Sequence, residues 1–169
     1  MRISAIVAFS SVLLAAGLSQ AAGTGTSNNS ASATANVTAN VVAPITLTKT
    51  SDLSFGDFTS DKAGCTVAVS AADVQTITGN CASLGSGTVS AASFTVGGSG
   101  NRSFTTNVAA TSANLSDGAG HTMALTLQNN APTHLTNGAA TIAVYGSLAV
   151  AANQAAGAYA DTVTVTVAY

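Results

Sequence analysis

Two histidines, His121 and His134, are the side chains best suited to proton transfer near neutral pH. Each lies in a stretch that Gly or Pro marks as a turn. A catalytic histidine needs a nucleophile and an orienting carboxylate within reach, and no motif in the chain singles out either partner. We therefore expect both histidines to be exposed loop residues, and we predict no catalytic residue.

The acidic residues offer a second kind of chemistry, because Asp52, Asp57 and Asp61 fall in one region and could contact a Ca²⁺ ion. The dense Asp-rich loop with a central Gly that holds this ion is missing, so solvated turn residues are the better interpretation. The chain has no Glu, and no two Asp form a recognisable pair for hydrolysis. The sequence therefore predicts no metal and no cofactor.

A Gly-rich run at residues 97–100 resembles a phosphate-binding loop only superficially. Such a loop opens a helix and carries a Lys, whereas here a new strand follows at once. Residues 97–101 are instead predicted to form a hairpin loop between two strands.

Cys65 and Cys81 are the only two cysteines, and 15 residues separate them. A metal or redox pair would need closer spacing or nearby His and Cys partners, which are absent from the sequence around them. In an exported chain an even number of cysteines indicates a disulfide. We predict a structural bond between them, worth about 3 kcal/mol by chain-entropy models.

The composition excludes several classes of protein. Charged residues make up 6% of the chain and the formal net charge is −2. The basic residues are all isolated, so we expect no nucleic acid partner: Arg2, Lys49, Lys62 and Arg102. Without Glu a helical bundle is disfavoured, and with 47% hydrophobic residues so is disorder.

The first 21 residues have the pattern of a signal peptide. Met1-Arg2 gives a positive start, residues 3–17 are apolar, and Ser19-Gln20-Ala21 offers a cleavage site. The apolar run is shorter than the roughly 20 residues that span a bilayer. We predict residues 1–21 to be a signal peptide, residues 22–43 a flexible N-terminal extension, and residues 44–169 an exported domain with no membrane span after cleavage.

Alternating apolar and polar residues predict strands along most of the chain. Every odd position from Ala31 to Leu47 is apolar, a period that fits a strand and would scatter around a helix. Pro44 should separate an extended segment from a strand at residues 45–49. Other predicted strands cover residues 53–58, 65–70, 74–78, 93–96, 103–108, 122–128, 142–150 and 158–169. Asn137-Gly138 predicts a tight turn. The fold class is thus all-β, an immunoglobulin-like antiparallel β-sandwich.

The alternating segment at residues 31–43 allows two interpretations. It is either the first strand of its own sandwich, or a donor strand that adds to the sheet edge of a neighbouring copy. In the second case the residues that would fill successive pockets are Ala33, Ala35, Val37, Ala39 and Val41.

The final stretch, Gly157-Ala-Tyr159-Ala-Asp-Thr-Val163-Thr-Val165-Thr-Val167-Ala-Tyr169, resembles the closing strand of chaperone-usher pilins. These pilins end in an alternating strand with a near-terminal Tyr and a Gly twelve residues before it. The sequence of residues 157–169 is particularly similar to that of the archaic pilins grouped with spore coat protein U. Residues 41–49 and 53–56 also resemble an uncharacterised family of pilin-like exported bacterial proteins.

This resemblance implies an incomplete fold that a donor strand completes. A periplasmic chaperone would pair with the C-terminal strand and be replaced, at an outer-membrane usher, by the N-terminal segment of the next subunit. The pairing residues would be Gly157, Tyr159, Val163, Val165, Val167 and Tyr169. In such pilins the disulfide often ties early strands together.

The resulting hypothesis is a structural subunit of a surface pilus or fimbria, not an enzyme, that supports adhesion or biofilm formation. Its partners would be copies of itself or related pilins, the chaperone and the usher. The alternative is a monomeric secreted adhesive or carbohydrate-binding β-sandwich whose N-terminal strand folds back on itself. An exported hydrolase ranks third, because no catalytic constellation stands out.

Overall fold

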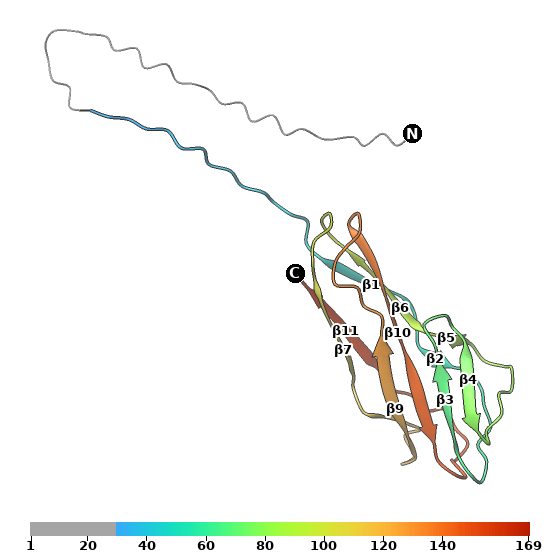
Figure 1. The fold of residues 1–169 in the computed structure, drawn as a ribbon. Helices are drawn as coiled ribbons and strands as arrows, with labels where there is room; N and C mark the ends of the chain where they lie inside the picture. Colours follow the sequence, from blue (N-terminus) through green and yellow to red (C-terminus); the bar gives the residue numbers. More distant parts are fainter. Residues whose placement is uncertain (1–29) are drawn as a thin grey trace, which may run out of the picture. The chain divides into compact units, whose positions relative to one another are not determined.

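The structure is a computed structural model that describes residues 30–169, so the predicted signal peptide at residues 1–21 lies outside the described residues. The described residues form eleven β-strands and no helix (Figure 1). The chain divides after Ala39 into two units, and the second, Asn40–Tyr169, holds all of these strands. They are β1 (Thr46–Ser51), β2 (Ser54–Phe55), β3 (Cys65–Val69), β4 (Gln75–Gly79), β5 (Val89–Ser90), β6 (Ala92–Gly97), β7 (Thr105–Ala110), β8 (Asn114–Ser116), β9 (Thr122–Asn129), β10 (Ala139–Val150) and β11 (Val163–Ala168).

The twelve-residue strand β10 is the centre of the larger sheet. Its first half pairs with β6 and its second half with β3, while β9 pairs with residues 144–149 of β10. The sheet order is β1-β6-β10-β3-β4, with β9 and then β8 attached to β10, and every pairing is antiparallel. A strand paired this fully should be deeply buried, and most of β10 is.

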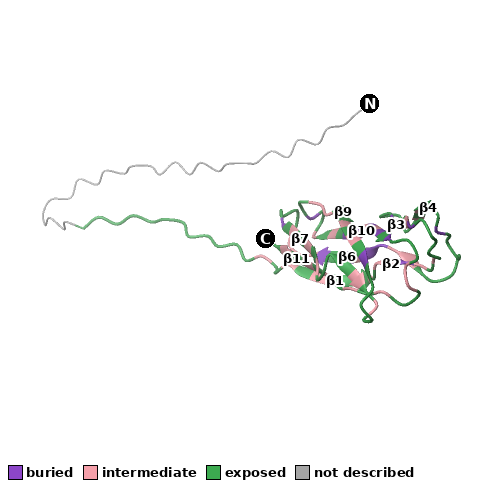
Figure 2. Cartoon of the chain, turned by 90° about the horizontal axis from the view of Figure 1, so that it is seen from below, coloured by how far each residue is buried: buried purple, intermediate pink, exposed green. Residues whose placement is uncertain are grey.

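A second layer, formed by β7 and β11, packs over the larger sheet. Valines of these two strands contact a buried cluster that includes Phe94 and Val96 of β6 and Ile142 and Val144 of β10. Figure 2 shows buried residues where the strands face one another. A further apolar cluster, around Val67 and Leu148, fills the other part of the domain. The prediction of an all-β antiparallel sandwich is therefore confirmed.

The local predictions for β10 and for the turn before it agree with the structure. The five residues expected to share one face of β10 are all buried: Ile142, Val144, Gly146, Leu148 and Val150. Asn137 and Gly138 form the tight turn before this strand, with φ angles of 53° and 83°. The period-two pattern thus selects the buried face correctly.

The predicted hairpin loop at residues 97–101 is wrong. β6 pairs with β1 along one edge and β10 along the other, so it has no free edge for β7. The loop crosses instead to the second layer, where β7 pairs with β11. The strand expected at residues 158–169 is also shorter, since β11 begins at Val163 and the preceding Ala160 makes only an isolated bridge to Ser116.

The predicted disulfide between Cys65 and Cys81 is present, with the two Cα atoms 5.7 Å apart. Cys65 begins β3 and pairs in register with Gly79, the last residue of β4. The bond therefore closes the open end of the β3–β4 hairpin, and Cys81 is buried in the cluster around Val67.

Removing this bond should destabilise the domain. We expect the Cys65→Ser, Cys81→Ser double variant to lose about 2–4 kcal/mol of unfolding free energy, because the unfolded chain regains the freedom of the closed loop. Urea unfolding would measure the loss. Equal stability with and without the bond would contradict this role.

Gly146 should tolerate no side chain. A Cβ at this position would overlap the carbonyl oxygen of Thr126 on the paired strand β9. We expect Gly146→Ala to cost about 1–3 kcal/mol in a thermal or urea unfolding experiment, because the backbone itself must shift. Gly157→Ala is the matched control, since its Cβ would meet the nearest atom, Asp117 Cβ, at an ordinary contact distance of 3.7 Å. A similar loss of unfolding free energy in both variants would contradict the explanation.

Candidate functional site: the seam between the first and last strands

The seam is the place where β1 and β11 lie side by side (Figure 1). Among the described residues β1 pairs only with β6, and β11 pairs only with β7. The two strands form no ladder with each other, so each turns one unpaired edge toward the seam. Free strand edges carry unsatisfied N–H and C=O groups and are templates for an additional strand.

Apolar side chains form the floor of the seam. Val163, Val165 and Val167 of β11 are half-buried and pack on the cluster around Ile142, while the alternate residues of this strand are exposed. Leu47 of β1 joins the same cluster from the other side. These valines are covered from one layer only, and further apolar surface laid on them would be removed from water.

The seam continues into a cavity of about 730 Å³. One wall, residues 53–60, follows β1 in the chain, and the other, residues 154–161, precedes β11. The hydroxyl of Tyr159 donates to the carbonyl of Ala155 and accepts from Nε2 of Gln154, each at 2.8 Å, and so fixes this second wall. The apolar part of the lining includes Leu115, Met123, Leu125, Leu148 and Val150.

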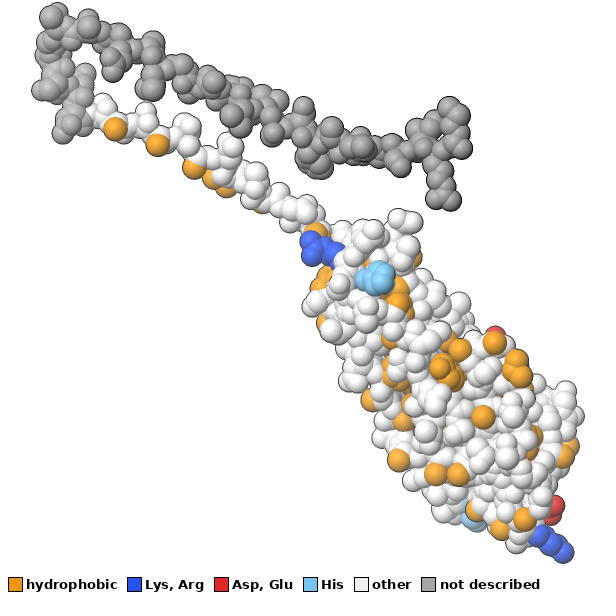
Figure 3. Space-filling view, viewed as in Figure 1, with side chains coloured by type: hydrophobic (Ala, Val, Ile, Leu, Met, Phe, Trp, Pro, Cys, Tyr) orange, Lys and Arg blue, Asp and Glu red, His pale blue; other side chains and the backbone are white. Residues whose placement is uncertain are grey.

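The predicted donor residues lie in a part of the chain without strand structure, since residues 30–45 contain none. Ala33, Ala35, Val37, Ala39 and Val41 are all exposed, and the two valines are each 94% exposed. Apolar side chains recur along this segment in Figure 3. Within the described residues the segment therefore has no partner strand of its own.

The residues predicted to pair at the C-terminus fall into three groups. Val163, Val165 and Val167 share one face of β11, as expected. Gly157 and Tyr159 lie in the loop that walls the cavity rather than in a strand. Tyr169 follows β11 and is 46% exposed, yet its hydroxyl accepts a hydrogen bond from the backbone N–H of Ser99 at 2.8 Å.

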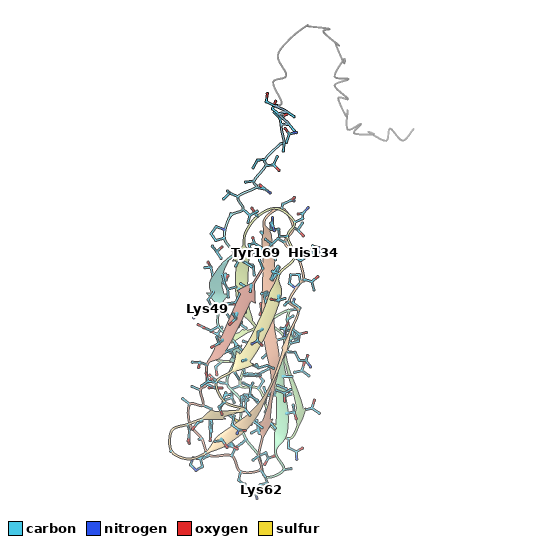
Figure 4. All side chains as sticks on the ribbon, turned by 90° about the vertical axis from the view of Figure 1, so that its left-hand side faces the viewer. Lys49, Lys62, His134 and Tyr169 are labelled. Atoms are coloured by element: carbon cyan, nitrogen blue, oxygen red, sulfur yellow. A yellow bond between two sulfur atoms is a disulfide. The ribbon has the colours of Figure 1, made fainter. Side chains whose placement is uncertain are left out.

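The seam also contains features that the sequence did not reveal. The cavity walls are about 100 positions apart in the chain, and Ser99 looks like any loop residue. Figure 4 places Tyr169 and His134 toward one end of the domain and Lys62 at the other. Tyr169 and the cavity thus mark the two ends of the seam.

The candidate metal ligands do not converge. Asp52 pairs with Lys49 at 2.6 Å, Asp57 accepts from the hydroxyl of Ser86 at 2.8 Å, and Asp61 accepts from the adjacent backbone N–H of Lys62. Within residues 30–169 no three His, Cys, Asp or Glu side chains gather as a metal site would require. His134 is exposed beside a bridge to Ser103.

His121 is exposed and contacts Asp117, with 2.6 Å between Nδ1 and the carboxylate. The Asp117 carboxylate also accepts from the backbone N–H groups of Ala119 and His121. Burial acts to raise the pKa of Asp117, but these hydrogen bonds and the nearby imidazole outweigh it, so the pKa lies below its ordinary value. The pair braces the turn between β8 and β9.

The geometry defines a class: a disulfide-bonded all-β sandwich in which the first and last strands each keep one unpaired edge. The chain belongs to the family described as a domain of unknown function, DUF4402, whose model matches residues 45–169. Comparison with curated proteins and with solved structures gives no significant match. In the part of the chain that the structure describes, no helix has the length and apolar character needed to cross a membrane.

The Asp117 turn predicts a pH dependence. A carboxyl whose pKa is lowered on folding stabilises the fold above its unfolded pKa, and that stabilisation is lost as the pH falls through the folded value. We expect the unfolding free energy of the wild type to fall toward that of Asp117→Asn as the pH drops below about 5. Urea unfolding across this range measures it, with Asp52→Asn, which removes an exposed carboxylate, as control. If the difference in unfolding free energy between the wild type and Asp117→Asn stayed constant across this pH range, the prediction would be contradicted.

Proposed function

We propose that the chain is a structural subunit of a surface fibre that assembles by donor-strand exchange. The observation that carries the proposal is the pair of unpaired edges at the seam, above a half-covered apolar floor. The exposed segment at residues 31–43 has the alternation that such a seam requires of a strand. In the proposal this segment enters the seam of a neighbouring copy.

The apolar side chains of the segment and of the seam floor recur with the same two-residue strand period. Alternate residues of a strand recur about every 6.5–7 Å, which is also the spacing of Val163, Val165 and Val167 along β11. For a strand to hydrogen-bond to both free edges, β1 and β11, which now lie in contact, would have to move apart to about 9.5 Å, twice the spacing of paired strands. The inserted strand would turn Ala33, Ala35, Val37, Ala39 and Val41 toward the floor, where small side chains suit a seam whose two strands lie close together.

The proposed partners follow from the same edges. Before assembly the seam would leave apolar surface and backbone groups exposed, so a periplasmic chaperone would cover it, as the resemblance to chaperone-usher pilins implies. An outer-membrane usher would then exchange the chaperone for the next subunit. The disulfide fits passage through an oxidising compartment outside the cytoplasm. In this proposal the protein is a building block of the cell surface and has no enzymatic activity.

Deleting residues 22–43 from the exported chain tests the donor role of the extension. We expect the truncated chain to form no fibres, to expose its seam, and to recover a folded monomer when a synthetic peptide of residues 31–43 is added. Size-exclusion chromatography and electron microscopy follow both forms. A truncated chain that stays folded and monomeric without peptide would show that the extension is no donor strand.

A charge among the predicted donor residues, which would face the seam floor, should block assembly. We expect Val37→Asp to abolish or strongly reduce fibre yield, since an unpaired charge buried on the seam floor costs several kcal/mol. Asn36→Asp is the matched control: it places the same charge one position away, on the opposite face of the strand. Fibre yield measured by sedimentation should drop only in Val37→Asp, and equal yields for both variants would contradict this register.

A further inference from the structure

Tyr169 is docked on the loop between β6 and β7. Its hydroxyl accepts from the Ser99 N–H at 2.8 Å, and the guanidinium of Arg102 lies 5.9 Å from the centre of its ring. A Cβ on Gly98 would overlap the same hydroxyl, so the phenol occupies space that only glycine leaves free. Tyr169, the residue that follows β11, is thus held in place by a close-fitting contact.

Ser99 makes a second contact, with the root of the N-terminal extension. Its Oγ accepts a hydrogen bond from the backbone N–H of Ala43 at 3.1 Å. Residues 40–42 line a small pocket together with residues 99–102. Ser99 therefore links the two ends of this site. Its N–H bonds to Tyr169, which follows β11, and its hydroxyl bonds to Ala43, the last residue of the extension.

The loop that carries Ser99 is itself well fixed. The N–H of Gly98 donates to the carbonyl of Gly138 at 2.9 Å, and the N–H of Gly138 donates to Gly100 at 2.7 Å. The side chain of Asn101 accepts from the N–H of Asn137 at 2.9 Å. Because these hydrogen bonds hold residues 98–101 in place, a movement of the Tyr169 side chain would be transmitted through Ser99 to Ala43.

We propose that Tyr169 and Ser99 couple the seam of a subunit to its own N-terminal extension. A strand bound in the seam would then reduce the motion of residues 40–43, the part of the extension next to the domain. β11 is paired along one edge only, and a strand held on one side opens more readily at its end than one held on both. A strand in the seam would fix β11 and with it Tyr169, Ser99 and Ala43. A subunit that has accepted a strand then presents its own donor better. This coupling rests on the proposed function, because it needs the seam to accept a strand.

Amide hydrogen exchange at Ala43 tests the coupling in the full chain. The background variant is Val37→Asp, which should not donate but keeps an intact seam, and the probe is a synthetic peptide of residues 31–43. Peptide binding should slow exchange at Ala43 about three- to tenfold, the effect of steadying one hydrogen bond. The amide of Asp73, which bonds to Ser70 in the β3–β4 turn away from the seam, reports the general stabilisation that filling the seam brings, and the slowing at Ala43 is measured in excess of it.

Three variants in this background separate coupling from general stability. Tyr169→Phe removes the hydroxyl and Ser99→Ala removes the acceptor for Ala43, and both should abolish the slowing while the peptide still binds. Ser99→Thr keeps the hydroxyl and should restore it. Urea unfolding identifies any variant that is merely less stable.

The outcomes distinguish the two proposals. Peptide that binds without slowing exchange at Ala43, or that slows it equally in Tyr169→Phe, would overturn the coupling and leave donor-strand assembly standing. A peptide that does not bind at all, judged by calorimetry, would overturn both. Slowing that is lost in Tyr169→Phe and Ser99→Ala and restored in Ser99→Thr supports the coupling.

Discussion

Every buried backbone N–H and C=O group of a strand needs a hydrogen-bond partner. The arrangement of this domain depends on which strands meet that requirement on both sides and which meet it on one side only. β10 is paired on both sides, and its inward residues from Ile142 to Val150 are fully buried. In the described part of the chain, residues 30–169, β11 is paired on one side and its valines are only half-buried. Among the described residues, backbone pairing and side-chain burial are therefore incomplete at the same edge, and the seam is where the proposal places an added strand.

Proteins usually protect free edges with charges, prolines or bulges. β1 has some of this protection: Pro44 precedes it, Lys49 lies within it, and its register shifts between Lys49 and Ser51. β11 has none of it, since its sequence is Val-Thr-Val-Thr-Val-Ala. With charged residues at 6% of the chain, little repulsion between copies keeps such an edge apart from others. An edge left so bare suits a strand that is meant to be paired, and it makes uncontrolled pairing the hazard that a covering partner would have to prevent.

What could be predicted from the sequence is what depends on neighbours in the chain. The alternation in β10, the turn at Asn137 and the disulfide follow from local pattern or from composition. The prediction of a hairpin loop at residues 97–101 is wrong because β6 pairs with β1 and β10, two strands that are distant from it in the sequence. The cavity could not be predicted for the same reason, and the bond between Ser99 and Tyr169 joins residues 70 positions apart. The short strands β5 and β8 have two and three residues, too few to carry a period.

The disulfide has a mechanical consequence. It closes the β3–β4 hairpin, which lies beyond β10 in the sheet, whereas a load applied between β11 and the segment before β1 would act first on the pairs β11–β7 and β1–β6. If such a pull unravelled the domain, the enclosed residues could not straighten, and the extended chain would be shorter by about 50 Å. The bond would thus limit how far the domain lengthens under tension and would keep β3 and β4 near each other, so that their hairpin could re-form first once the tension is released.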